Sequence, residues 1–584
     1  MQSRSEQACT ACKKLKRRCD KNLPECSLCQ RTGRECEYGI TGPPQPTAND
    51  WVFMQTRLAE LESRLVGSPS VFQQSMSPVP VPASTSSSTM CDAADSHSPE
   101  HTSVTSSSRS AGFTPVDSRT EDPDPQPGAH FPASLFLDVD YYVWSRARLP
   151  PPRGAIPTPV LALLSQGSIV LDVSQDYFAT VHTWLPIVSK KRMDMGLPVQ
   201  NAGPDLAMLF LGMKLITVRA NDVAGGELYS MAKDFIARLE SNGAVSLLCL
   251  QAMVLIALYE YSHAIYPAAW MTIGSCARYA DILGFTTGDY SVLGQATTWT
   301  EAEERRRVWW SIYILDKLVS AGSRRRCLIS DLQPDARLPV DDEAWDCGDV
   351  TKALGHAASS PYQIEQSGFA RLCQASMYLD RAISCARESQ SMNSSRIAEV
   401  MTLAHELTGF VAALDSQSTA LEPEDSFAFL APRCITRSAL FVALDRFTCP
   451  EKVAAEPGYL HSSVAKTQSE HDLQRQSMYV IQLASEQLHT LGMDISDMIK
   501  NDKDTAQPFL LGRVSPFVMD SVYASAATFH WLLGETGKEV YRTAATDLDA
   551  FLDTLSSRWR LGSAYRDVLT LYDVSARVEA NTVF

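Results

Sequence analysis

The 584-residue sequence lacks an excess of positive charge. It contains 52 basic and 67 acidic residues, which gives a formal net charge of −15 at pH 7. A surface this acidic repels the phosphates of nucleic acid, so any nucleic-acid binding must come from a local basic segment. Hydrophobic residues make up 45% of the chain, which is enough for a sizeable core and excludes disorder throughout.

The N-terminus lacks the apolar stretch of a secretory signal peptide. We therefore expect no oxidising compartment and no disulfides among the 15 cysteines. The best candidate for a membrane span, residues 241–259, contains Ser, Asn and Gln side chains and lacks flanking basic anchors. It is interpreted as a buried core helix, and no membrane is predicted as a partner.

The large C-terminal region, residues 131–584, lacks the motifs of common enzymes. It contains no GxGxxG, P-loop or GxSxG sequence. His405 and Glu406 begin like the HExxH motif of zinc hydrolases, but position 409 is Gly, so the second histidine is missing. His182 has apolar neighbours, which favours a core residue over a ligand. No catalytic residue and no enzymatic activity are predicted.

What the sequence does contain is a cluster of six cysteines within 28 residues. They follow the spacing C-x2-C-x6-C-x6-C-x2-C-x6-C, so that the second half repeats the first: Cys9, Cys12, Cys19, Cys26, Cys29 and Cys36. Two thiolates separated by two residues can chelate one soft divalent ion on a tight turn. Two tetrahedral zinc ions require eight ligand positions, which six thiolates supply only if two of them bridge both ions. The symmetry of the spacing makes Cys9 and Cys26 the predicted bridges.

This pattern resembles the fungal Zn(II)2Cys6 binuclear-cluster DNA-binding domain. Residues 11–20 look like the family's basic helix, and Pro24 stands where the family commonly places a loop proline. The resemblance implies two Zn2+ ions, a small metal-stabilised fold with two short helices, and binding to double-stranded DNA. A three-disulfide knot would require secretion, and a zinc-storage peptide would not require five basic residues between two ligands.

The cluster carries local positive charge. Residues 9–36 contain eight basic and three acidic side chains, a net charge of +5, of which about +3 remains when six thiolates and two Zn2+ ions are included. In the resembling family, a lysine three residues before the third cysteine reads a CGG-type triplet at guanine N7 and O6, and here that residue is Lys16. Leu15 stands where relatives often carry a second basic residue. The predicted phosphate partners are Lys13, Lys14, Arg17 and Arg18. The same stretch matches a nuclear-import signal, so the nucleus is the expected location.

A short coiled coil is predicted at residues 51–66, after a linker at 39–50 that contains Gly and Pro. Its a/d seam would consist of Trp51, Met54, Leu58, Leu61 and Leu65. One triplet of base pairs is too short to select a promoter, so the chain is expected to bind two CGG-type half-sites as a homodimer. Because the pattern spans only about two heptads, a helix docked on its own protein and a monomer on one triplet remain as alternatives.

The rest of the chain divides by composition. The DNA-binding domain is placed at residues 1–38, and the Ser-, Thr- and Pro-rich residues 67–130 are predicted to be a disordered linker. Helical periodicity without parallel-sheet signatures or fixed repeats predicts one large all-α regulatory domain at 131–584. Helices are expected at 206–215, 244–259, 269–283, 302–320, 398–414, 477–491 and 547–555.

Several stretches of this region resemble the fungal-specific transcription factor domain, which is an all-helical regulatory region. They are Tyr177-Phe178 with the stretch 182–187, the segment 270–285, and the segment 304–320 with Trp309 and Trp310 in its apolar body. The resemblance extends over about residues 155–350. The two tryptophans are interpreted as core residues rather than as part of a ligand site.

Together, these features predict a nuclear, zinc-dependent, sequence-specific transcription factor acting on RNA polymerase II genes, and specifically an activator of a metabolic or secondary-metabolite pathway. A repressor is one alternative. An effector-binding or enzymatic helical domain that is merely anchored to DNA by the cluster is another. The acidic and apolar residues 547–555 would either recruit coactivators or form an amphipathic helix on a folded surface.

Overall fold

The computed structural model describes residues 8–14, 17–36, 131–145, 149–194, 203–219, 224–285, 296, 298–323, 325–329, 332, 336–351, 355–387, 394–449, 467–503 and 510–582. The chain divides into two units, one up to Val104 and one from Thr105, and each is described by itself. Lys16, the predicted coiled coil at 51–66 and the predicted linkers at 39–50 and 67–130 lie outside the described residues.

The N-terminal unit contains two short helices, α1 (Thr10–Lys14) and α2 (Ser27–Thr32). Cys26 caps the start of α2, since its Sγ accepts a hydrogen bond from the Cys29 N–H at 3.4 Å. Gly33 ends α2 in the left-handed conformation, with φ 58°, where a residue without Cβ is favoured. Two short helices joined by irregular loops are the fold predicted for this part of the chain.

The second unit is helical, and its described residues contain no β-strand, only one isolated bridge between Arg337 and Ala357. The predicted all-α class is therefore confirmed. Its helices in the first half are α4 (Ser134–Leu137), α5 (Val139–Trp144), α6 (Thr158–Leu164), α7 (Ile169–Ala179), η1 (Val181–Thr183), α8 (Lys190–Asp194), α9 (Pro204–Thr217), α10 (Ala224–Ser241), α11 (Leu247–Ser262), α12 (Ala268–Ile282), α13 (Trp299–Ala321) and α14 (Asp342–Cys347). Those in the second half are α15 (Gly368–Arg387), α16 (Ser394–Thr419), α17 (Pro423–Ser426), η4 (Phe427–Phe429), α18 (Leu430–Leu444), η5 (Asp445–Phe447), α20 (Gln468–Lys503), α21 (Leu510–Arg513), η6 (Pro516–Val518), α22 (Met519–Thr536), α23 (Glu539–Ser556) and α24 (Leu561–Thr582).

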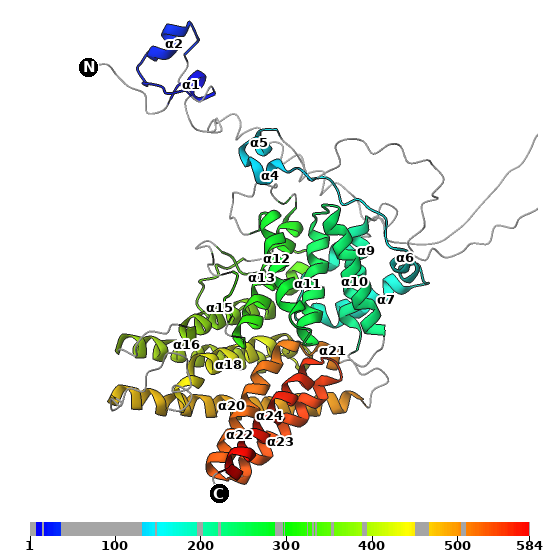
Figure 1. The fold of residues 1–584 in the computed structure, drawn as a ribbon, viewed down its shortest axis with the longest axis vertical. Coiled ribbons are helices and arrows are strands. Elements are labelled where there is room, and N and C mark those ends of the chain that lie inside the picture. The colour runs from blue at the N-terminus through cyan, green and yellow to red at the C-terminus, as the bar shows by residue number, and fades with distance from the viewer. Residues whose placement is uncertain are drawn as a thin grey trace, which may run out of the picture. The chain divides into compact units, whose positions relative to one another are not determined.

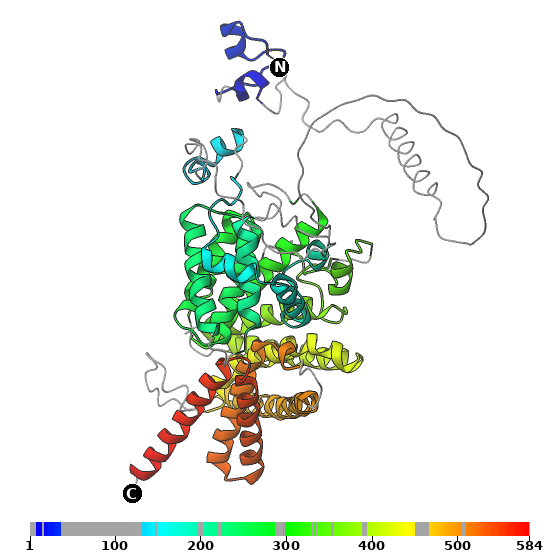
Figure 2. The same ribbon diagram turned by 90° about the vertical axis from the view of Figure 1, so that its right-hand side faces the viewer.

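Helix α11 is the central helix in the first half of the unit. It packs against α9, α12 and α13, which Figures 1 and 2 show side by side in green. Every residue from Cys249 to Ser262 is buried, because α11 is apolar on all sides. The helix begins at Leu247 rather than at the predicted position 244, since the Ser246 hydroxyl accepts the Cys249 N–H at 3.2 Å and caps it there.

Helix α18 is the central helix in the second half of the unit. It packs against α15, α16, α20 and α22. Helices α22, α23 and α24 pack against one another, and Figure 1 shows them in orange to red. The apolar side chains of α23 face this packing, and its buried residues include Leu548, Phe551, Leu552 and Leu555. Of the two alternatives for residues 547–555, the structure favours the amphipathic helix of the folded domain, because the apolar face of this segment is part of the core.

Helix α13 contains the predicted core stretch 304–320. Trp310 is buried as expected, whereas Trp309 is half-buried and packs against the core. Arg307, in the same stretch, is fully buried. Its guanidinium forms ion pairs with Glu303 at 3.0 Å and with Asp342 at 2.7 Å. The paired carboxylates allow a charged residue to occupy the core.

Two histidines considered in the sequence have ordinary structural surroundings. His182 is buried, and its Nε2 lies 3.0 Å from the Asp346 carboxylate, as befits a core residue. His405 is exposed on α16, and the adjacent Glu406 pairs with Arg381 at 2.6 Å. Neither histidine belongs to a group of possible metal ligands among the described residues.

Two helical segments of the described residues are long and apolar enough to cross a membrane, α16 and the continuous stretch Phe427–Phe447. In the second, 83% of the apolar window is buried inside the protein, which is typical of a core helix. Such segments are weak grounds for a membrane span by themselves. The sequence candidate at 241–259 corresponds to the buried helix α11, which has only 16 residues.

Candidate metal centre

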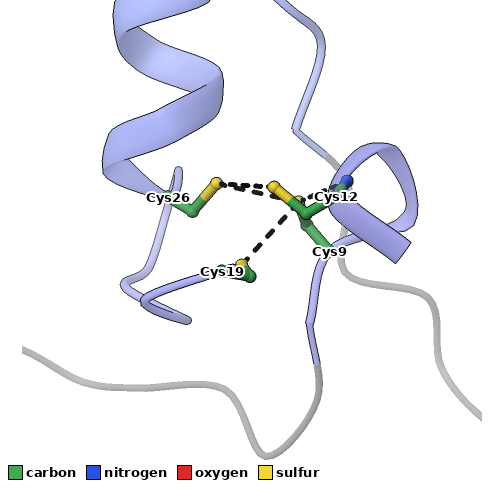
Figure 3. Close-up of side chains that lie close together, drawn as sticks. All are labelled: Cys9, Cys12, Cys19 and Cys26. Atoms are coloured by element: carbon green, nitrogen blue, oxygen red, sulfur yellow. Dashed lines mark hydrogen bonds between the residues drawn. The ribbon is translucent and has the colours of Figure 1, made fainter. Parts of the chain in front are cut away.

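The two halves of the cysteine cluster are built alike. In the first half, the Sγ of Cys9 accepts the N–H of Cys12 at 3.4 Å, and in the second, the Sγ of Cys26 accepts the N–H of Cys29 at 3.4 Å. Each C-x2-C pair therefore starts a helix, with the first cysteine just before the helix and the second within it. This local repeat turns the sulfurs of Cys9 and Cys12 toward that of Cys26, as Figure 3 shows.

The sulfur atoms lie at the separations expected for ligands of a common ion. Cys9 Sγ is 3.7 Å from Cys26 Sγ and 3.6 Å from Cys29 Sγ, and Cys12 Sγ is 3.6 Å from Cys26 Sγ. Cys19 Sγ lies 3.9 Å from Cys9 Sγ. Zinc–sulfur bonds of about 2.3 Å in a tetrahedron place two sulfurs about 3.8 Å apart, whereas a disulfide needs about 2.0 Å. None of the six cysteines forms a disulfide, so the structure fits a metal centre and contradicts the disulfide-knot alternative.

The six sulfurs form two overlapping groups of four, within each of which all ligand atoms lie within 4.8 Å of one another. One group contains Cys9, Cys12, Cys19 and Cys26, and the other contains Cys9, Cys26, Cys29 and Cys36. Only Cys9 and Cys26 belong to both. Two tetrahedral sites that share two corners need this arrangement, so the residues present fit a pair of zinc ions.

The electrostatics of the cluster also favour a cation. Burial raises the pKa of Cys26, but hydrogen bonds from the Cys29 N–H and the surrounding thiols outweigh this effect and lower the pKa to about 6. Burial and hydrogen bonds to Cys9 and Cys26 raise the pKa of Cys12 to about 12. Sulfurs this close together cannot all be deprotonated when no cation is present, because their negative charges repel one another. Divalent ions remove this repulsion because the thiolate is the form that binds metal.

A hydrogen-bonded turn that the cysteine spacing does not predict joins the two halves. The Asp20 carboxylate, next to Cys19, accepts the Ser27 N–H at 3.1 Å and also the Ser27 hydroxyl. The hydroxyl contact is the main cause of the lowered pKa of Asp20. The turn contains Pro24, whose peptide bond with Leu23 is cis. The signal in the sequence is the start of a helix at Ser27, because the N-terminus of a helix attracts an acidic side chain such as that of Asp20.

Four of the predicted DNA-contacting residues are described, and all four side chains are exposed: Lys13, Lys14, Arg17 and Arg18. The first two lie on α1, and the other two lie between α1 and Cys19. The segment between two cysteines of one group therefore presents a basic surface to solvent. Lys16 lies between these residues in the sequence and outside the described part of the structure.

Comparison with known protein families gives two matches. The fungal Zn(2)-Cys(6) binuclear cluster domain matches residues 7–43, which include all six cysteines. The fungal specific transcription factor domain matches residues 175–403, which begin just before Tyr177 and include α13. The second match begins later than the range of about 155–350 indicated by the sequence motifs alone, and it ends beyond that range, at residue 403.

Comparison with individual proteins gives relatives from several fungi. The chain is 38% identical to Transcription factor BOA15 of Botryotinia fuckeliana over 30% of this chain and 98% of that protein. It is 25% identical to the depudecin biosynthesis cluster-specific transcription activator DEP6 of Fusarium langsethiae, over 56% of this chain and 58% of that protein. It is 24% identical to the citrinin biosynthesis transcriptional activator ctnR of Monascus purpureus, over 59% of this chain and 58% of that protein. The chain thus spans less than two thirds of the length of these two activators.

Proposed function

The chain belongs to the fungal Zn2Cys6 transcription factors, and from this premise we propose that it is a nuclear, sequence-specific activator of the genes of one metabolic or secondary-metabolite pathway. The observation that carries this proposal is the pair of overlapping four-sulfur groups directly beside an exposed basic segment. The names of two relatives, activators of depudecin and citrinin biosynthesis, support the activating role and the kind of pathway.

The proposed zinc ligands follow from the two sulfur groups. One Zn2+ is assigned to Cys9, Cys12, Cys19 and Cys26, and the other to Cys9, Cys26, Cys29 and Cys36. When bound, the ions crosslink the two halves of the module. This crosslink would stabilise a segment in which the fully buried apolar side chains, among the described residues, are those of cysteines.

DNA recognition is assigned to the basic segment between Cys12 and Cys19. Lys16 is proposed to donate hydrogen bonds to guanine N7 and O6 of a CGG-type triplet in the major groove. Its neighbours are proposed to contact phosphates, which provides affinity without sequence preference: Lys13, Lys14, Arg17 and Arg18. A homodimer joined through residues 51–66 would place two such modules on two half-sites.

The full-length protein and the promoters that it occupies provide the test. Genome-wide mapping of bound sites is expected to recover CGG triplets, and deletion of the gene is expected to reduce transcripts next to those sites. Lys16→Ala is expected to weaken binding to a CGG site by about 5- to 150-fold, from about 1–3 kcal/mol per lost base contact, and to remove the preference for guanine. Arg34→Ala, at an exposed residue after α2, is the matched control and should preserve that preference. Sites without CGG, or an unchanged preference in Lys16→Ala, would refute the proposal.

A further inference from the structure

An acidic side chain lies beside the basic segment of the metal centre. Asp20 directly follows Cys19 and is exposed. A negative charge at this place works against binding to DNA phosphates, because it opposes the charges of Arg17 and Arg18. A useful role for Asp20 must therefore come from its contacts inside the module.

The Asp20 carboxylate joins the two halves of the cysteine cluster. Its two oxygens accept the Ser27 N–H at 3.1 and 3.2 Å, and Oδ2 also accepts the Ser27 hydroxyl. The same Oδ2 accepts the side-chain amide of Asn22 at 2.9 Å. Hydrogen bonds to a charged acceptor are about twice as strong as those between neutral groups. Because Ser27 is the first residue of α2, these bonds connect the end of the first half to the start of the second.

The backbone next to Asp20 has an uncommon conformation. Lys21 has a φ of 62°, in the left-handed region that residues with a Cβ rarely adopt. Such a conformation persists only where the surrounding contacts maintain it. The bond from Asn22 to Asp20 spans Lys21 directly, and the bonds from Ser27 close the turn. The hydrogen bonds of Asp20 therefore hold this connection in one conformation.

The bonds between Asp20 and Ser27 fix the neighbours of two candidate zinc ligands. Asp20 follows Cys19, and Ser27 follows Cys26. Both cysteines belong to the same four-sulfur group (Figure 3). Cys19 is half-buried, whereas the other three members of that group are buried. Cys19 is thus the ligand that burial holds least, and the hydrogen bonds of Asp20 tie it to the second half of the module.

We propose that Asp20 is a positioning residue of the metal centre, which through its bonds to Ser27 holds Cys19 within reach of a zinc ion. It thereby also holds the end of the basic segment at 13–18, which Cys12 and Cys19 anchor in one four-sulfur group. Contacts that orient metal ligands typically contribute about 10- to 100-fold in metal affinity. The inference rests on the proposed zinc ligands and DNA contacts. In this role Asp20 binds neither zinc nor DNA itself.

The test compares three variants of the full-length protein with the wild type. Asp20→Ala removes the carboxylate. Asp20→Asn removes the charge but keeps an oxygen that can accept from Ser27, and Asn and Asp are about equally good at the start of a helix. The matched control is Glu25→Ala, which removes the same charge from an exposed residue directly before Cys26. Bound zinc ions are counted by native mass spectrometry at a series of buffered free-zinc concentrations, and the affinity for a CGG site is measured by fluorescence anisotropy.

Asp20→Ala should need about 10- to 100-fold more free zinc than the wild type to hold two ions. Asp20→Asn should need at least about fivefold less than Asp20→Ala, and Glu25→Ala should match the wild type. At the lowest free-zinc concentration that fills the wild type, the DNA affinity of Asp20→Ala should fall about two- to tenfold, because fewer molecules carry a complete metal centre. Glu25→Ala should bind DNA equally or more tightly, since only a repulsive charge is lost.

Three results would overturn the proposal. One is equal zinc binding by Asp20→Ala and Glu25→Ala. Another is a gain in DNA affinity of the same size in both, which would show that Asp20 acts only as a surface charge. The third is zinc binding by Asp20→Asn that is as weak as that of Asp20→Ala, which would exclude the bonds to Ser27 as the cause. A wild-type protein without zinc, or without a preference for CGG, would instead refute the proposed function.

Discussion

Replacement of Arg307 by methionine should destabilise the helical domain strongly. The Arg307 guanidinium forms ion pairs with Glu303 and Asp342, donates to the Val340 carbonyl at 2.8 Å, and lies 4.2 Å from the centre of the Trp345 ring. Methionine fills similar space but leaves the fully buried Glu303 carboxylate without this partner. Breaking a buried ion pair from one side costs about 3–5 kcal/mol, so we expect a loss of that size.

The assay is urea unfolding of the purified full-length protein, followed by far-ultraviolet circular dichroism. The control is Arg542→Ala, which removes an exposed pair with Glu539 on α23 and should cost less than about 1 kcal/mol. The double variant Arg307→Met/Glu303→Leu should be less destabilised than the sum of the two single variants, because the two side chains interact directly. If Arg307→Met unfolded at the same urea concentration as Arg542→Ala, the buried pair would contribute no stability and the reasoning would be refuted.

Two further predictions concern the helical domain. Burial lowers the pKa of His263 to about 4, against 6.5 for the unfolded chain. Below pH 6.5 the unfolded chain therefore binds a proton that the folded protein does not. The free energy of unfolding should be unaffected by this residue above pH 6.5 and should fall by about 3 kcal/mol as the pH decreases to 4. His263→Gln should show a shallower loss of unfolding free energy over that range than the wild type, and equal slopes would argue against the shift. In α23, Phe551→Ala should cost about 3–5 kcal/mol in urea unfolding because its ring is buried, while the exposed Val540→Ala should cost less than about 0.5 kcal/mol. Equal midpoints for these two variants would contradict the placement of 547–555 in the core.

The metal centre could be predicted in detail from the sequence because its geometry is local. All six cysteines lie within 28 residues, and the repeated spacing already paired Cys9 with Cys26 as equivalent positions. The structure places these two sulfurs in both four-sulfur groups. Helices were predictable for the same reason, since their periodicity is read from neighbouring residues. The start of α11 differs from the predicted one because the Ser246 hydroxyl caps the helix there.

Features that depend on distant residues could not be predicted in this way. Arg307 follows two other arginines and suggests a charged, solvated stretch, and its burial depends on Asp342, 35 positions later. The contact between His182 and Asp346 spans 164 positions. The apolar face of α5 reads in sequence like that of any core helix, and only the structure shows that Trp144 remains exposed. Periodicity identifies an apolar face but not what covers it.

The central claim is that two zinc ions share Cys9 and Cys26, and native mass spectrometry of the full-length protein tests it most directly. The wild type should carry two zinc ions, and the control Cys434→Ser, at a buried cysteine of the helical unit, should also carry two. Cys9→Ser removes a ligand from both proposed sites at once, so it should carry fewer than two and lose specific DNA binding. A wild-type protein with one zinc ion or none, or a Cys9→Ser variant that keeps two, would contradict the claim.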